Sequence, residues 1–434
     1  MSTQNEWQQR SNALNAAILS AKSNINTRSF QLDSPTTRQC NALKTLEDLL
    51  GCLQLFAQEH YNYFENLFFG SGVAENAQTC SKYPSEYVFS VIFDQISFDL
   101  AVITQAANQR LSQNQQELQT LEKADEITRR ALQPVMEYLQ LQDIRIVSYF
   151  KKDMSIRVIP YAPVALVGIP YTVACISQDF LAIPHEVGHY VYWHGTLASG
   201  RTVQEELSHV VNKNPLWCYR WLEETFADIY GCLTAGPAIA LSFQDLQMRN
   251  TPVEFIENDE DHPVPILRPN IYTRVLTEDF EDWAAPLDKR WNDDDAQTGK
   301  WRERTSNNEF KHRNGTMKSV PEAMTDLNEM VDTIVSLLKS VHDKEAATWW
   351  WNYLQPETTV DTLYQAFAEH VDLLVLEEAT QVVSDLTHPN FVALRDKWLE
   401  QGQKLKDAPP WITVLNAGGW ATKGPQCEGS GTCD

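Results

Sequence analysis

Two histidines placed four residues apart, His185 and His189, with Glu186 between them, constrain this 434-residue chain more than any other feature. On a helix, residues four apart lie one turn apart on the same face, so both imidazoles can reach one metal ion. The carboxylate of Glu186 falls beside that face, where it can hold and deprotonate a water molecule. This H-E-x-x-H pattern is typical of zinc hydrolases. A helix carrying two ordinary histidines is the alternative, so a third ligand has to be found.

The third ligand is predicted on a later helix, from about Pro215 to Ala235. Glu224 and Asp228 lie one turn apart on this helix, and two carboxylates on one buried face are costly unless a cation is near. We therefore expect Glu224 to bind zinc and Asp228 to accept the outer N–H of a ligand histidine. Glu223 is the competing ligand, and Glu224 is preferred because only it has the one-turn partner. A solvated acidic face is the alternative.

A second class of zinc site has a glycine three residues after the second histidine and a third histidine six residues after it. Tyr192 and Gly195 occupy those two positions, so this class is excluded. The H-E-x-x-H element followed by E-x-x-x-D at Glu224 to Asp228 instead resembles the gluzincin metallopeptidases. Together with an H-P-x-x-x-x-R element at His262 to Arg268, it is similar to the CAAX-prenyl endopeptidases and the bacterial heat-shock membrane proteases.

The resemblance covers about Ala165 to Tyr272. In that family the H-P element borders the active-site cleft, which implies that His262 and Arg268 hold substrate or stabilise the oxyanion. We keep Tyr272 as a reserve candidate for the oxyanion. From the residues alone, a rigid proline-rich loop whose Arg268 pairs with an acidic neighbour is an equal alternative. Family members are typically membrane-embedded, whereas this sequence has no apolar run long enough to span a bilayer. We therefore expect a soluble gluzincin.

Composition excludes several classes of protein. The net charge of −23 argues against nucleic acid and anionic membranes as partners, because phosphate groups would be repelled. The segment Met1 to Arg28 is rich in Ser, Asn and Gln and lacks the apolar core of a signal peptide. The 8 cysteines form no C-x-x-C pair and are too sparse for a disulfide scaffold, which favours the cytoplasm.

We divide the chain into an N-terminal helical region (1–140), a zincin-like catalytic core (141–275) and a C-terminal helical region (276–434). In the first region, apolar spacing predicts helices over Thr37 to Phe69 and from Ser85 to about Gln142. Two long helices of this kind usually pack as an antiparallel hairpin.

The catalytic core is predicted to begin with a small antiparallel sheet. Ile144 to Phe150 and Ser155 to Pro160 alternate in polarity and predict a β-hairpin. Ala165 to Tyr171 is a third strand, and we expect it to form the edge that pairs with an extended substrate. Pro184 belongs in the first turn of a helix, so the metal-binding helix should begin near Ala182.

The C-terminal region begins with a polar stretch, Thr277 to Thr316, predicted as a long loop or two short helices. Helices follow over Pro321 to Val341, Thr358 to Val383 and Asn390 to Leu405. The glycine-rich tail, 418–434, contains Cys427 and Cys433 and cannot bury enough surface to fold alone. A frayed end is one reading of the tail, and self-inhibition by occupation of the protein's own cleft is the other.

These observations predict a mainly α protein with a small antiparallel β-sheet in a zincin-like core flanked by helical lobes. The predicted function is zinc-dependent hydrolysis of peptides or proteins, with Zn²⁺ on His185, His189 and Glu224 and with Glu186 as general base. One alternative is an interaction protein with a structural zinc site. The other is a zinc hydrolase acting on a non-peptide amide.

Overall fold

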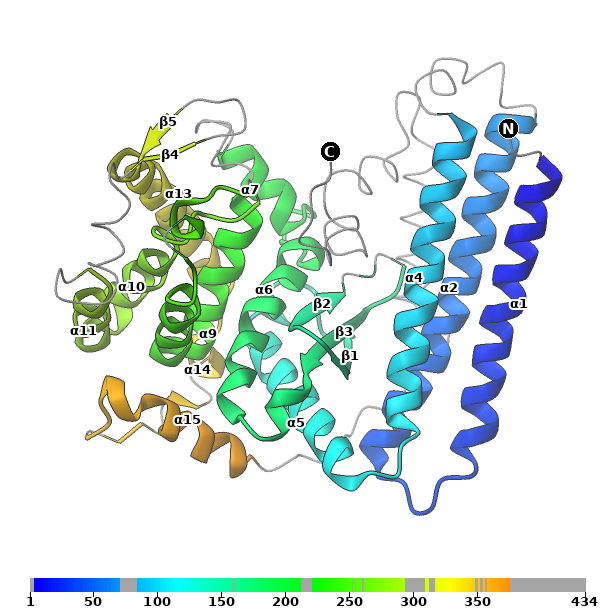
Figure 1. The fold of residues 1–434 in the computed structure, drawn as a ribbon, viewed down its shortest axis with the longest axis horizontal. Helices are drawn as coiled ribbons and strands as arrows, with labels where there is room; N and C mark the ends of the chain where they lie inside the picture. The colour runs from blue at the N-terminus through cyan, green and yellow to red at the C-terminus, as the bar shows by residue number, and fades with distance from the viewer. Residues whose placement is uncertain are drawn as a thin grey trace.

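A computed structural model gives the fold of the protein. The described residues are 4–70, 84–157, 159, 161–211, 221–251, 253–259, 261–292, 309–311, 317–347, 350–351, 354–355 and 357–374. They are mainly helical with a small β-sheet, as predicted (Figure 1). The predicted helix over Asn390 to Leu405 and the tail over 418–434 lie outside the described residues.

Three long helices form a bundle at one end of the molecule: α1 (Gln4–Ser29), α2 (Thr37–Phe69) and α4 (Ser85–Arg110) (Figure 1). The predicted packing of α2 against α4 as an antiparallel pair is confirmed. Helix α1 was not predicted, because its sequence is polar and only a few side chains, such as Trp7, are buried. The Trp7 ring stacks on Phe89 and Phe93 of α4, with centroids 5.3 and 5.7 Å apart.

The single helix predicted from Ser85 to about Gln142 is wrong, because the chain breaks after α4 and starts α5 (Gln115–Leu132). The side chain of Asn114 accepts hydrogen bonds from the backbone N–H groups of Gln116 and Glu117, which caps the new helix. A three-residue 3₁₀ turn, η2 (Gln133–Val135), ends it.

The three-stranded sheet differs from the predicted one in order and direction. Strand β3 (Val164–Pro170) pairs in parallel with β1 (Arg145–Lys151) and antiparallel with β2 (Ser155–Arg157), which gives the order β1-β3-β2. The sheet is therefore mixed, and the predicted β-hairpin is wrong because β3 lies between its two strands. The prediction that Ala165 to Tyr171 forms the edge is also wrong, since β3 is the central strand.

Strand β3 is central because both of its faces are buried. Val164 and Leu166 contribute to the hydrophobic core shared with the three-helix bundle. Ala165 and Val167 contribute to a second core, built with the helices on the other side of the sheet. A strand buried on both faces has a continuous apolar sequence instead of an alternating one.

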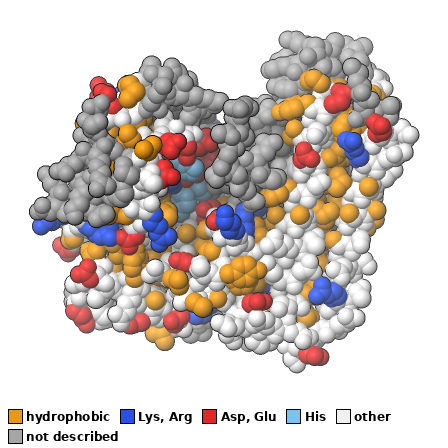
Figure 2. Space-filling model, in the orientation of Figure 1, with side chains coloured by type: hydrophobic (Ala, Val, Ile, Leu, Met, Phe, Trp, Pro, Cys, Tyr) orange, Lys and Arg blue, Asp and Glu red, His pale blue; other side chains and the backbone are white. Residues whose placement is uncertain are grey.

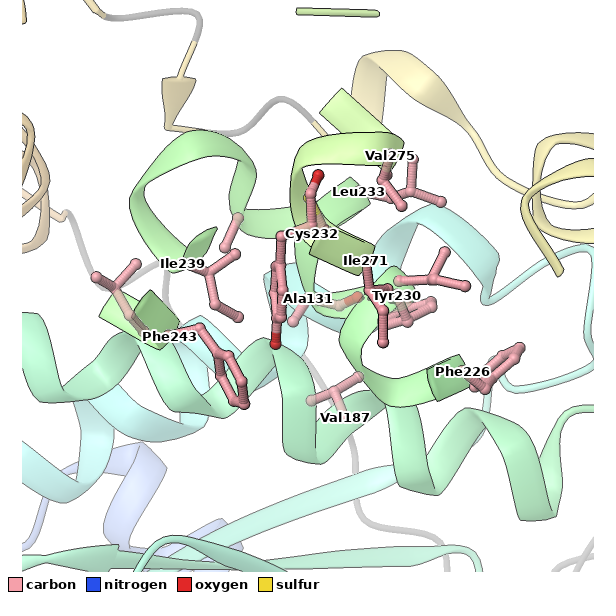
Figure 3. Packing of buried hydrophobic residues seen from close by; sticks show 14 of the residues in the cluster. Ala131, Val187, Phe226, Tyr230, Cys232, Leu233, Ile239, Phe243, Ile271 and Val275 are labelled. Carbon is pink, nitrogen blue, oxygen red and sulfur yellow. Dashed lines mark hydrogen bonds between the residues drawn. The ribbon is translucent and has the colours of Figure 1, made fainter. Parts of the chain in front are cut away.

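The second core surrounds two helices that pack along each other, α6 (Ile183–His194) and α9 (Leu222–Gln247). Figure 3 shows Val187 of α6 and Phe226 and Tyr230 of α9 among the buried side chains. Helix α6 begins at Ile183 with Pro184 in its first turn, as predicted. Helix α9 was predicted to stop at Gly236; it bends there, with a φ of 60°, and continues as a helix to Gln247.

Shorter helices complete the second core. The predicted polar stretch contains α11 (Glu281–Asn292) and strand β4 (Glu309–Lys311), which pairs with β5 (Met317–Ser319). The predicted helix over Pro321 to Val341 is confirmed as α13 (Val320–Ser340). The described helices in this part of the chain also include α7 (Val203–Val211), α10 (Arg268–Asp279), α14 (Lys344–Ala347) and α15 (Leu363–Asp372).

Two of the described helices, α4 and α9, are long and apolar enough to cross a membrane by length and composition alone. In α9, 89% of the most apolar window is buried inside the protein, and in α4 the figure is 50%. The apolar sequence of α9 is explained by its place as the central helix of the second core.

A buried ion pair fastens strand β2 to helix α4. Arg157 Nη2 lies 2.8 Å from Asp99 Oδ1, and Asp99 also accepts a hydrogen bond of 2.9 Å from the Tyr161 hydroxyl. The Arg157 and Asp99 side chains are 4% and 2% exposed. Burial raises the pKa of Asp99, and the charge of Arg157 opposes this shift. The ionised form of Asp99 is therefore stabilised by Arg157.

Replacing Arg157 by methionine should therefore destabilise the protein strongly. Removing one partner of a buried pair typically costs about 3–5 kcal/mol. Urea unfolding at neutral pH measures the loss. Arg274→Met is the matched control, because the Arg274–Asp332 pair is exposed, with side chains 40% and 53% accessible, and should lose about 1 kcal/mol or less. Equal losses in both variants would contradict this account of the pair.

Candidate metal centre

Helices α6 and α9 bring the three predicted metal ligands together. The Nε2 atoms of His185 and His189 lie 3.2 Å apart. One oxygen of Glu224 lies 3.5 Å from His185 Nε2, and the other lies 3.5 Å from His189 Nε2. Tetrahedral zinc with ligand distances of about 2.0–2.1 Å places its ligand atoms roughly 3.3–3.4 Å from each other. One ligand atom from each of these three side chains lies within 4.8 Å of the others, so the group could hold a metal ion. The two 3.5 Å contacts run to different oxygens of Glu224, so a zinc ion would draw one of these oxygens closer to both imidazoles.

Each histidine has a carboxylate behind its other ring nitrogen. His185 Nδ1 lies 3.0 Å from Asp228 Oδ1, so Asp228 is near the predicted position, but the angle does not make a hydrogen bond. His189 Nδ1 lies 2.9 Å from Glu223 Oε1. Glu223, by hydrogen bonding to Nδ1, fixes the ring of His189 and the tautomer that leaves its Nε2 free to bind a metal. The sequence analysis considered Glu223 as a competing metal ligand. In the structure it instead contacts the outer nitrogen of His189.

Arg268 and Tyr272, both from α10, hold the carboxylates of α9. Arg268 donates from Nε to Asp228 Oδ2 at 2.6 Å and from Nη2 to Glu224 Oε2 at 2.8 Å. The Tyr272 hydroxyl donates to Asp228 Oδ1 at 2.7 Å, and the tyrosine is fully buried. The Arg268 guanidinium also lies over the ring of Phe243, 4.6 Å from its centroid. These contacts fix Glu224 and Asp228 before any metal binds.

His262 approaches the same group from the loop before α10. Its Nε2 lies 3.3 Å from Glu224 Oε1, and its Nδ1 lies 2.6 Å from Asp259 Oδ2. The side chain is 43% exposed, against 1% for His189. His262 therefore stands at the solvent side of the candidate centre, where an incoming ligand can meet it.

Glu186, the neighbour of His185 on α6, lies beside an edge of the sheet. Its Oε2 accepts a hydrogen bond of 2.9 Å from the backbone N–H of Ile156 in β2. Since β2 is an edge strand that packs against α6, the sheet edge beside this helix is β2 and not the predicted Ala165 to Tyr171, which forms the central strand.

The electrostatics of the centre favour positive charge. Burial lowers the pKa of His185, but its interactions with Asp228 and Glu224 outweigh burial and raise the pKa to about 9. Burial raises the pKa of Glu224, yet the charges of His189 and His262 hold it well below its usual value. The pKa of Asp228 is also lowered, because the charge of Arg268 offsets burial. Two ionised carboxylates in a buried site are the environment in which a divalent cation is stabilised.

The close approach of α6 and α9 depends on Gly188, which is the fourth residue of the H-E-x-x-H motif. A Cβ atom at this position would lie 2.7 Å from Ala227 Cα, which is backbone and cannot turn aside. Gly188→Ala should therefore push the two helices apart and separate the histidines from Glu224. We expect roughly 1–3 kcal/mol of lost stability from overpacking, together with weaker zinc binding. Competition with a zinc-binding dye measures the affinity, and an unchanged value would contradict the argument.

Comparisons of the chain with models of protein families, with curated proteins and with solved structures gave no match. The interpretation of the site therefore depends on its own geometry and chemistry.

Proposed function

We propose that this protein is a zinc-dependent metallopeptidase of the gluzincin type, with a zincin-like arrangement of α6, α9 and strand β2. The observation that carries the proposal is the convergence of His185, His189 and Glu224, whose ligand atoms lie within 4.8 Å of one another. Three protein ligands would leave a fourth position open, as catalytic zinc sites do. Zinc bound there would lower the pKa of a coordinated water to about 7 and polarise a substrate carbonyl.

The chain's own residues supply the remaining steps. Glu186 takes the proton of the attacking water and passes it to the leaving amine. His262 stabilises the developing oxyanion, since its ring is exposed at the solvent side of the centre and is supported by Asp259. Arg268 and Tyr272, first considered for the oxyanion, instead position Asp228 and Glu224 through buried hydrogen bonds. An extended peptide would lie along β2, the sheet edge beside α6.

A structural zinc site is the second candidate, and the position of His262 favours it. With Nε2 3.3 Å from Glu224 Oε1, His262 could serve as a fourth protein ligand and close the site. The Glu186 of the H-E-x-x-H motif argues against a structural site, because such a site has no use for a general base.

Cleavage of a diverse peptide library, analysed by mass spectrometry, tests the proposal. We expect zinc-loaded protein to cut a subset of peptides and chelator-treated protein to cut none. Cleavage of non-peptide amides alone would instead favour a zinc hydrolase that acts on a non-peptide amide. One tightly held zinc per chain without any cleavage would favour the structural site.

A further inference from the structure

A cavity of about 230 Å³ lies beside the candidate metal centre. It is lined by the end of α9, the segment that follows it and the start of α10. His262 and Arg268 belong to both the cavity and the metal centre, because each contacts Glu224, at 3.3 and 2.8 Å. A group bound in the cavity would therefore lie one side chain away from the reacting atoms.

The walls of the cavity carry an excess of negative charge. Glu254, Glu257 and Asp259 all line it. Arg268 already forms ion pairs with Asp228 and Glu224, and His262 forms one with Asp259. Neither Glu254 nor Glu257 forms an ion pair with any residue in the described part of the chain. In the view of Figure 2, red acidic side chains lie next to pale-blue histidine side chains.

The side-chain amide of a glutamine in the same wall indicates a second feature of the ligand, a hydrogen-bond acceptor. Gln247 is only 6% exposed and lines the cavity. Its Oε1 accepts a hydrogen bond of 2.9 Å from Asn250 Nδ2, but its Nε2 donates to none of the described residues. This Nε2 atom is not one of the fully buried atoms without a partner, so it is accessible from the cavity, where a ligand carbonyl can take the place of water as its acceptor. The cavity therefore fits a ligand that has both a positive charge and a carbonyl oxygen.

We propose that this cavity is a substrate subsite for the cationic group of a peptide residue next to the scissile bond. The group is an ammonium or guanidinium, supplied by a lysine or arginine side chain or by a free amino terminus. Glu254 and Glu257 neutralise its charge, and Gln247 donates to a peptide carbonyl of the same residue. The volume corresponds to roughly eight water molecules at their liquid volume of about 30 Å³, enough for the seven heavy atoms of an arginine side chain. This inference rests on the proposed peptidase function.

Calorimetric binding of short peptides to the zinc-loaded Glu186→Gln variant tests the subsite without relying on turnover. The peptides form matched pairs: lysine against norleucine, arginine against citrulline, and a free against an acetylated amino terminus. We expect loss of the positive charge to weaken binding by at least about tenfold, or roughly 1.4 kcal/mol. Which pair responds identifies the source of the charge.

The Glu257→Gln variant, made in the same background, should remove most of that preference. The matched control is Glu329→Gln, which makes the same change at an exposed position on α13 outside the cavity and should leave the preference intact. Equal affinities within every pair would overturn the subsite, even if wild-type protein cleaves the peptides. A charge preference in binding without any cleavage by wild-type protein would support the subsite and contradict only the peptidase proposal.

Discussion

Glu186→Gln is expected to lose peptide hydrolysis while it keeps its zinc and its melting temperature. The amide has the shape of the carboxylate and can still accept the hydrogen bond from the Ile156 N–H, which is 2.9 Å long in the native protein. It cannot take a proton from water. General-base catalysis contributes typically about 10²–10⁴-fold to the rate, so we expect a loss of at least that order.

Two controls make this result specific. Zinc content per chain and thermal unfolding should match those of the native protein, because Glu186 is not one of the three ligand side chains. Glu186→Asp, which keeps a carboxylate on a shorter side chain, should retain more activity than the glutamine variant. Full activity in Glu186→Gln would remove this residue from the mechanism and favour the structural zinc site.

Glu224→Ala is expected to lose zinc binding, and Glu223→Ala only to weaken it. Glu224 faces both histidine Nε2 atoms at 3.5 Å, so its removal deletes one of three ligands and leaves Arg268 without one of its partners. Glu223 touches only the outer nitrogen of His189, at 2.9 Å. Loss of such a supporting carboxylate typically costs about 10–100-fold in metal affinity.

Elemental analysis and chelator competition on the two purified variants measure these effects. Glu223→Gln serves as a further control, since its amide oxygen can still accept a hydrogen bond from His189. Full zinc in Glu224→Ala, together with none in Glu223→Ala, would exchange the two roles and contradict the proposed ligand set.

The parts of the centre that were predictable from sequence are those with local spacing. His185 and His189, like Glu224 and Asp228, lie one turn apart on a single helix, and that relation follows from helix geometry alone. The meeting of the two helices was inferred from chemistry, because a two-histidine site needs a further ligand. The contact of Glu223 with the outer nitrogen of His189 was not predicted. A signal was available, because each ligand histidine usually donates its other N–H to an acceptor, and Glu223 was the second carboxylate nearby.

The order of the strands could not be predicted, because pairing between strands is set by contacts distant in sequence. The alternation in Ile144 to Phe150 and Ser155 to Pro160 indicated strands, but it did not indicate that β3 would lie between them. The apolar run of β3 was the available signal that it is buried on both faces. The break after α4 also had a signal, since Asn114 followed three residues later by Glu117 is typical of a helix start.

Zinc restoration tests the central claim most directly. Chelator-treated protein is mixed with increasing zinc, and peptide cleavage and bound zinc are measured on the same samples. The proposed function predicts that cleavage rises in proportion to bound zinc and saturates at one ion per chain. Cleavage that survives complete removal of zinc, or that stays absent with one zinc bound per chain, would contradict it.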